Sequence, residues 1–599
     1  MAKRAKLTRE QKLENHSASE QSRRDATLEL EAELKELSGY KGSTEKRAIL
    51  MGHIADWLGQ IVRENDELED MVLQVALEQS MSNVSRVISV EWLPPMANSS
   101  SSTLAKCESS IPPSLRPLVR AYLLGCATSI GPRLLGLLLQ YGPRLTSQRK
   151  PANATRDTHR TQHDEPFLAA LRRILARALD LHGFPAFCAA LLPLRDILDR
   201  LAKDLSEKSR KRLSRWLACF IAAWLSLRLL QSKQSPSFTS TAAEPGSDEL
   251  PGHLASKPVR YAGRTLDLTL FAVTRALDVI AGELWHRRRL RRQAAGQWTP
   301  VEAAISRLTD PAVFALSSGI VMWTWIYQPS RLPRAYDKWI RSAAAVDERL
   351  LEALRRCRAG ELVYGRDTGQ APLLGAMCAD YGWPREWGDP ARSIPFPCEM
   401  VHMGCGPSCE RHAASRFLRS FRWALTSYLP IALVLAASRS SSSSSRTSSS
   451  RTSSSLRALR HALLSAARSS TFLGAFIALF YYGVCLARTR LGPRVLGRDA
   501  RARQRIDGGA CVAAGCALCG WSILLESARR RGDVALFVAP RALAALLPRR
   551  YPADKQWRET LAFAASTAVV FACALENPRR VRGLIGALLG VVLGPRCDK

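Results

Sequence analysis

The stretch Asp533-Val-Ala-Leu-Phe-Val-Ala-Pro-Arg-Ala-Leu543 decides the fold of this chain, because it occurs twice. An earlier stretch, Asp267-Leu-Thr-Leu-Phe-Ala-Val-Thr-Arg-Ala-Leu277, has Asp, Leu, Phe, Arg, Ala and Leu at the same places. Two further pairs of similar segments flank these copies in the same order along the chain. Three matches in register predict a duplicated unit, and a repeat determines architecture before any local motif does.

The flanking matches are shorter but keep their spacing. Gly131-Pro-Arg-Leu-Leu-Gly136 is similar to Gly492-Pro-Arg-Val-Leu-Gly497. Downstream, Phe314, Ala315, Ser317, Val321, Pro329 and Arg331 correspond to Phe563, Ala564, Ser566, Val570, Pro578 and Arg580. All of these segments lie among apolar runs, so the repeated unit is predicted to be a membrane unit.

The charge balance favours a lipid surface over nucleic acid. The chain has 599 residues, with 86 Lys and Arg against 53 Asp and Glu, a formal charge of +33. In a soluble protein this excess would indicate nucleic-acid binding. Here many Arg residues lie between apolar segments, as they do where membrane flanks meet anionic lipid headgroups. We therefore expect the lipid bilayer as partner and no nucleic acid.

Apolar segments of helical length predict an all-α, polytopic membrane protein with two related repeat halves. Five of these segments fall in the second half, at residues 472–487, 508–526, 534–547, 561–575 and 581–593. A bilayer span needs about 20 apolar residues, with about 17 as a minimum, so several are borderline and a soluble helical bundle remains the alternative. Gly586, Gly590 and Gly594 form a ladder of small residues, which allows close helix packing in lipid.

Composition divides the chain into four regions. Residues 1–105 form a polar helical extension, either a coiled-coil partner helix or a solvated appendage. Residues 106–350 and 421–599 are the two membrane halves, and a Cys/His-rich connecting region over 351–420 joins them. The second half contains a Ser-rich tract at 438–455, which is predicted to be a disordered loop insertion because Ser and Arg cannot build a core.

The densest set of metal-ligating residues lies in the connecting region, where Cys398, His402, Cys409 and His412 follow one another closely. Thiolate and imidazole ligands suit tetrahedral zinc, and neighbouring glycines allow a knuckle-like turn. The spacing is not that of a standard zinc finger. A structural turn with free thiols and a redox-sensitive pair therefore remain as alternatives to zinc.

Each copy of the repeated stretch carries an acid and a base eight residues apart, Asp267 with Arg275 and Asp533 with Arg541. Eight residues are slightly over two helical turns, so each pair could share a helix face. Ionisable groups at membrane depth are costly and mark functional paths. The alternative is that all four charges lie at the interface and extend towards water.

Several motifs resemble the transmembrane protein 135 family in its fungal form. Its Cys-rich region is similar to Pro397-Cys-Glu-Met-Val-His-Met403, Gly406-Pro-Ser-Cys409 and Arg419-Ser-Phe-Arg-Trp-Ala-Leu425. Arg120-Ala-Tyr-Leu-Leu-Gly125 and Gln504-Arg-Ile-Asp-Gly-Gly509 fit the same family, and the resemblance covers roughly residues 110 to 595. It implies a multi-pass organelle membrane protein, which in animals is associated with peroxisomes and mitochondria. It also implies a link to lipid metabolism and organelle dynamics, and a distant similarity to the translocase channel family of the mitochondrial inner membrane.

No nucleotide-binding loop, metalloprotease motif or nucleophile elbow occurs in the sequence, and the resemblance supplies no catalytic residues, so we expect no enzyme. The predicted role is transport or membrane organisation in mitochondria or peroxisomes. A scaffold that recruits organelle-division or lipid-handling proteins is the alternative, and a membrane enzyme that uses the Cys/His cluster is a third reading. Oligomerisation is compatible with each of them.

Overall fold

The computed structural model describes residues 115–126, 129–130, 167–178, 180, 182–191, 208–232, 239–241, 258–441, 448–576 and 580–593. All of them belong to one of the two units into which the chain divides, namely 65–137 together with 158–599. The predicted polar extension over 1–105 lies outside the described residues, as does the segment Gly131–Gly136.

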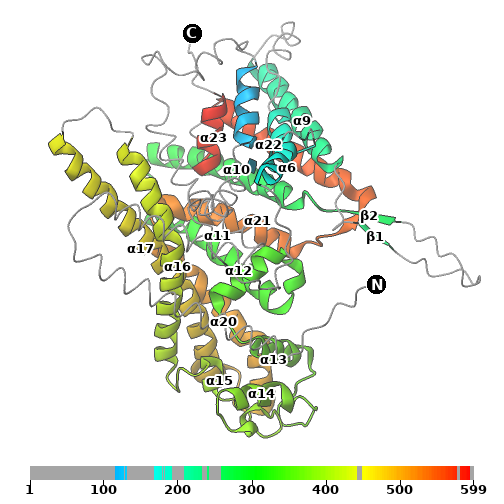
Figure 1. Ribbon diagram of the computed structural model, residues 1–599, viewed down its shortest axis with the longest axis vertical. Helices are drawn as coiled ribbons and strands as arrows, with labels where there is room; N and C mark the ends of the chain where they lie inside the picture. The colour runs from blue at the N-terminus through cyan, green and yellow to red at the C-terminus, as the bar shows by residue number, and fades with distance from the viewer. Residues whose placement is uncertain are drawn as a thin grey trace, which may run out of the picture. The chain divides into compact units, whose positions relative to one another are not determined.

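Helices account for most of the described chain, and Figure 1 labels many of them. The α-helices after a first helical stretch at 116–126 are α6 (Phe167–Ala178), α7 (Phe184–Ala190), α9 (Lys208–Ser232), α10 (Leu266–Ala294), α11 (Pro300–Tyr327), α12 (Arg334–Ala344), α13 (Glu348–Ala359), α14 (Ala371–Asp380), α15 (Cys398–His402), α16 (Cys409–Ser441), α17 (Ser448–Leu486), α18 (Gly492–Val495), α19 (Ala500–Arg505), α20 (Cys511–Cys519), α21 (Ala528–Leu546), α22 (Gln556–Glu576) and α23 (Gly583–Leu593). Shorter turns are η2 (Pro329–Arg331), η3 (Arg385–Gly388), η4 (Ala487–Leu491), η5 (Ile506–Ala510), η6 (Gly520–Leu525) and η7 (Ala553–Lys555).

The start of α11 shows how the local sequence sets a helix boundary. Thr299 accepts a hydrogen bond from the Glu302 backbone while the Glu302 carboxylate accepts one from the Thr299 backbone, which is a capping box. Pro300 occupies the first helical turn, where its missing N–H is not needed. The C-terminal half of α11 is apolar, and its Trp325 and Ile326 are almost completely buried.

The two repeated stretches lie in α10 and α21, and these helices pack against each other. The helices that follow them pack crosswise, because α10 contacts α22 while α21 contacts α11. The matched Phe314 on α11 and Phe563 on α22 are both buried in the core. The corresponding helices of the two stretches therefore make reciprocal contacts.

Helices α16 and α17 form a long antiparallel hairpin, and α17 also packs on α20. The prediction of a disordered insertion over 438–455 is wrong at both ends, because α16 continues to Ser441 and α17 begins at Ser448. Serine is only moderately unfavourable in a helix, so the tract extends helices that the neighbouring apolar residues have already nucleated. Residues 442–447 lie outside the described chain.

A small antiparallel sheet in the order β1 (Thr239–Thr241), β2 (Pro258–Ala262) and β3 (Tyr551–Pro552) joins segments that lie far apart in the sequence. Ala262 pairs with Tyr551 across the β2–β3 register. This pairing places Thr265 and Tyr551 beside the buried Glu559 of α22, whose carboxylate accepts a hydrogen bond from each hydroxyl.

Among the described residues, four helical segments are long and apolar enough to cross a membrane. They are Leu213–Ser232, Leu459–Val495, Ala500–Leu525 and Ala553–Glu576. The helical content and these four segments confirm the coarse prediction of a mostly helical chain with candidate membrane spans.

The predicted small-residue ladder does not serve as a helix-packing stripe in the described chain. A side chain at Gly586 would collide with the Val581 carbonyl, so this glycine lets the chain turn tightly into α23. Gly590 is exposed and a side chain there would meet nothing nearby, and Gly594 lies outside the described residues. Spacing alone cannot show whether a neighbouring helix is present.

Candidate functional site

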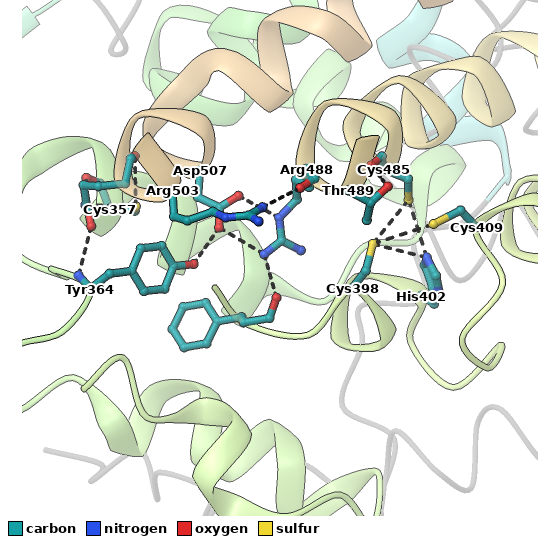
Figure 2. A network of polar contacts seen from close by, with 12 residues as sticks. Cys357, Tyr364, Cys398, His402, Cys409, Cys485, Arg488, Thr489, Arg503 and Asp507 are labelled. Carbon is teal, nitrogen blue, oxygen red and sulfur yellow. Dashed lines mark hydrogen bonds and ion pairs between the residues drawn. The ribbon is translucent and has the colours of Figure 1, made fainter. Parts of the chain in front are cut away.

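Four thiol and imidazole groups converge where the connecting region meets α17. The sulfurs of Cys398, Cys409 and Cys485 and a ring nitrogen of His402 all lie within 4.8 Å of one another. His402 Nε2 is 3.5 Å from the sulfurs of both Cys398 and Cys485. The Cys398 sulfur is 3.9 Å from that of Cys409 and 3.8 Å from that of Cys485. We call these four residues the Cys3His cluster (Figure 2).

Local backbone geometry brings three members of the cluster together. Cys398 and His402 are the ends of α15, four residues apart, so their side chains lie on one helix face. The chain then reverses through left-handed backbone at Met403, Gly404 and Gly406 and delivers Cys409 to the start of α16. His402 Nδ1 lies 2.7 Å from the Gly406 carbonyl oxygen, which fixes the ring with Nε2 towards the thiols.

The structure corrects the predicted ligand set at its fourth member. His412 is not part of the cluster, and Cys485 of α17 takes the fourth place. The His412 ring instead stacks on the His402 ring, with 4.7 Å between their centroids, and lies edge-on to Tyr481. His412 follows Cys409 by three residues on α16 and packs against the His402 ring without reaching the thiols.

The protonation of these groups follows from their surroundings. The hydrogen bond with Cys485, followed by the contact with His402, lowers the pKa of Cys398 to about 4 against the effect of burial. Burial favours the neutral His402 ring, but its contacts with Cys398 and Gly406 raise the pKa of His402. Burial lowers the pKa of His412 to about 3, so that ring is neutral. The cluster thus favours a thiolate at Cys398.

A buried ion pair between Arg488 and Asp507 lies next to the cluster (Figure 2). Its hydrogen bonds with Tyr364 and Phe396 link it to the connecting region. Arg488 Nε donates to Asp507 Oδ1 at 2.6 Å and Arg488 Nη2 donates to Oδ2 at 3.0 Å. Tyr364 donates its hydroxyl to Asp507 at 2.5 Å, and Arg488 also donates to the Phe396 carbonyl. Both charged side chains are at most 7 % exposed.

Each partner of this ion pair lies in a π-helical turn, Arg488 in η4 and Asp507 in η5. Such turns insert one residue into a helix and are frequent at functional sites. The neighbouring Gln504 donates to the carbonyls of Cys357 and Leu362 and accepts from the Tyr364 backbone. The segment 504–509 therefore holds residues 357–364 of the connecting region through Gln504.

The predicted intrahelical charge pairs do not form. Asp267 binds Arg549 at 2.6 Å, and Arg541 donates to the Phe537 carbonyl at 2.7 Å. Eight residues separate the members of each predicted pair along the axis by about 12 Å, which is too far for direct contact. Asp533 instead lies near Arg275 of the other repeated stretch.

One feature of the repeated stretches recurs in both copies. The Arg275 guanidinium lies over the Phe271 ring at 5.2 Å, and the Arg541 guanidinium lies over the Phe537 ring at 3.5 Å. The spacing Phe-x-x-x-Arg places cation and ring on neighbouring turns of one helix. The repeated motif thus encodes the same local contact twice.

A cavity of about 240 Å³ is lined mainly by α11, α12, α17 and α21, and α10 contributes Phe271 and Arg275. Its polar side chains are Arg275, Ser318, Glu526, Arg530 and Asp533. Much of its remaining lining is aromatic, with Phe271, Phe314, Tyr336, Trp339, Tyr428, Phe472, Phe476 and Phe537. The two bases and two acids balance, so the cavity has polar groups without a net charge.

Asp533 is the most constrained of these charges. Burial raises the pKa of Asp533, and the nearby Arg275 opposes this rise. Gly583, at the start of α23, has a φ of +72°, and a side chain there would collide with the Asp533 carboxylate. The carboxylate therefore approaches the N-terminal turn of α23, where helix N–H groups favour a negative charge.

Sequence reasoning missed Cys485, Arg488, Asp507 and Glu559 as members of buried polar groups. Cys485 lies within the apolar run 472–487, and Arg488 directly follows this run, one helical turn later. This spacing is the one sequence feature that indicates a shared polar site. Such an arginine could equally extend into water. It predicts a buried ion pair only when the acidic partner of the arginine is known. The partner Asp507 follows in a different helix.

The four candidate spans and the mostly helical content define a helical chain that is compatible with membrane insertion. Comparisons with protein families, with curated proteins and with solved structures find no match to this chain.

Proposed function

We propose that this chain is a multi-pass integral membrane protein of mitochondria or peroxisomes that transports a small molecule with an apolar body and a polar group. The observation that carries the proposal is the cavity that Arg275 and Asp533, from the two repeated stretches, both line. Neither repeated helix is among the four candidate spans, and the cavity borders one of these spans through Phe472, Phe476 and Ile477 of α17. The organelle assignment rests on the resemblance to the transmembrane protein 135 family.

The packing of the repeated helices supports a duplicated transporter architecture. Crosswise contacts, in which α10 meets α22 and α21 meets α11, are what a pseudo-two-fold relation between two copies produces. Transporters built from repeats bind substrate at the interface between them. The cavity reaches both repeated helices, since α10 contributes Phe271 and Arg275 and α21 contributes Asp533 and Phe537.

The size and lining of the cavity support the proposed substrate class. A cavity of about 150 Å³ already holds benzene when its walls are apolar, and this one measures about 240 Å³. Aromatic side chains suit an apolar body. The paired charges suit a polar group, and their balance gives no preference for an anion or a cation.

Two measurements test this proposal with the full chain. First, alkaline carbonate should leave the protein in the membrane pellet, and release into the supernatant would remove the basis of the proposal. Second, phosphatidylcholine liposomes containing the purified chain should accelerate passage of a fluorescent fatty-acid analogue. Asp533→Asn and Gly583→Ala, which change the cavity carboxylate or its approach, should lower this rate by about tenfold, a change worth about 1.4 kcal/mol.

The matched control is Asp554→Asn, because Asp554 is an exposed carboxylate outside the cavity. A scaffold that recruits organelle-division or lipid-handling proteins is the alternative function, and it needs only exposed loops. Equal rates for wild type, Asp533→Asn and Asp554→Asn, all well folded, would favour the scaffold over the transporter.

A further inference from the structure

Four distances within the Cys3His cluster agree with those of a tetrahedral zinc site. With Zn–S near 2.3 Å and Zn–N near 2.05 Å, a tetrahedron has S···S edges of about 3.8 Å and S···N edges of about 3.6 Å. The two S···N distances given for the cluster are both 3.5 Å. Its two given S···S distances are 3.8 and 3.9 Å. Four of the six edges therefore match a four-coordinate metal site.

We propose that Cys398, His402, Cys409 and Cys485 bind one Zn²⁺ as a closed structural site, which joins the connecting region to α17. Three thiols and one imidazole are a standard donor set for structural zinc. Four protein ligands leave no open position for a substrate or water, so the site is structural and independent of the proposed transport function. The metal binds three thiolates, so each cysteine that is still protonated loses its proton on binding, and all three sulfurs donate electron pairs to the metal.

The surroundings of His402 fit a metal ligand. Zinc-bound histidines almost always donate their other ring N–H to a carbonyl or carboxylate, which sets the tautomer and the ring orientation. His402 has this arrangement, with Nδ1 2.7 Å from the Gly406 carbonyl and Nε2 towards the sulfurs. Gly404 and Gly406 have left-handed backbone conformations, and the resulting turn places the Gly406 carbonyl against the His402 ring.

The identity of the fourth ligand separates this proposal from a site built from neighbouring residues alone. Cys485 comes from α17 and crosses from the second membrane half to the connecting region. A site with His412 would close within one segment, whereas a site with Cys485 fixes two segments to each other. Bound zinc would therefore hold the connecting region against α17.

The test measures zinc in the full chain, purified in detergent without chelator. Elemental analysis should find about one zinc per chain, as a single four-ligand site requires. Cys485→Ser should leave the site substoichiometric, whereas His412→Phe should keep its zinc. Cys378→Ser is the matched control, because Cys378 is a fully buried cysteine outside the cluster.

A second readout covers the case in which Cys485→Ser does not fold. In the wild-type chain, thiol alkylation followed by mass spectrometry should modify Cys398, Cys409 and Cys485 only after a chelator removes zinc. Cys405, a partly exposed thiol outside the cluster, should react at the same rate in both states.

Three results would overturn the proposal. The first is a folded wild-type chain without zinc, even after incubation with the metal. The second is loss of zinc in His412→Phe with full occupancy in Cys485→Ser. The third is a disulfide between two of the cluster cysteines in protein purified under reducing conditions, which would identify a redox pair.

Discussion

Replacing Asp507 with alanine should be among the most destabilising single changes in this chain. The substitution leaves Arg488 buried without its partner, since the two groups form two hydrogen bonds of 2.6 and 3.0 Å. It also removes the acceptor of the Tyr364 hydroxyl. Breaking a buried pair by removing one partner costs about 3–5 kcal/mol, because a charge remains buried without compensation.

An exposed ion pair provides the matched control. Arg392 and Glu386 are 3.2 Å apart in the connecting region, with side chains 68 % and 72 % exposed. Exposed pairs contribute about 0–1 kcal/mol because water and salt screen them. The free energy of unfolding should therefore fall at least about threefold more for Asp507→Ala than for Glu386→Gln.

The assay is denaturant unfolding of the full chain in detergent, followed by tryptophan fluorescence. The double substitution Arg488→Met with Asp507→Leu should cost less than Asp507→Ala alone, since no unpaired charge remains. Equal effects of Asp507→Ala and Glu386→Gln would refute the reasoning, because they would mean that water reaches the pair and screens it.

Two further substitutions test other buried contacts. Glu559→Gln should lower the free energy of unfolding by about 1.5–3 kcal/mol, since the carboxylate accepts charge-assisted hydrogen bonds from Thr265 and Tyr551. An unchanged unfolding midpoint would contradict this, because it would mean that water already solvates these groups. Although burial acts in the opposite direction, hydrogen bonds from Arg349 lower the pKa of Asp347. The charged form of Asp347 thus stabilises the fold above its unfolded pKa of about 3.9, and this contribution is lost as the pH falls through the lower pKa of the folded state. Asp347→Asn should lower stability at pH 7 and reduce its loss below pH 4, whereas parallel stability profiles for wild type and variant would contradict this.

Local sequence predicted those parts of the molecule that local geometry determines. Cys398 and His402 lie four residues apart on a short helix, and the glycines that follow allow the turn to Cys409. These three ligand candidates could therefore be found from spacing alone. The apolar runs likewise became helices, and four of the resulting segments meet the length and composition of membrane spans.

The fourth cluster member could not be found in this way. Cys485 lies in an apolar run, where a thiol is most often an inert core residue. Closeness in sequence predicts His412 as the fourth ligand, but α16 directs its ring against the His402 ring and Tyr481. Only the packing of α17 against α16 shows which side chain reaches the three local ligands.

The charges of the repeated stretches show the same limit. Within one helix, Asp533 and Arg541 are about 12 Å apart along the axis and cannot pair directly. Their partners come from the tertiary fold, since Asp533 lies near Arg275 and Arg541 contacts Phe537 and Tyr336. The contact that sequence does encode is the four-residue spacing of Phe and Arg in each copy.

One short stretch of helix carries contacts of both the Cys3His cluster and the buried ion pair. Cys485 and Arg488 are three residues apart, so one turn of α17 and η4 contacts both α15 and Asp507 of η5. Residues three apart lie on one helix face, so this single turn presents Cys485 to His402 and Arg488 to Asp507. The same turn therefore serves both the Cys3His cluster and the buried ion pair.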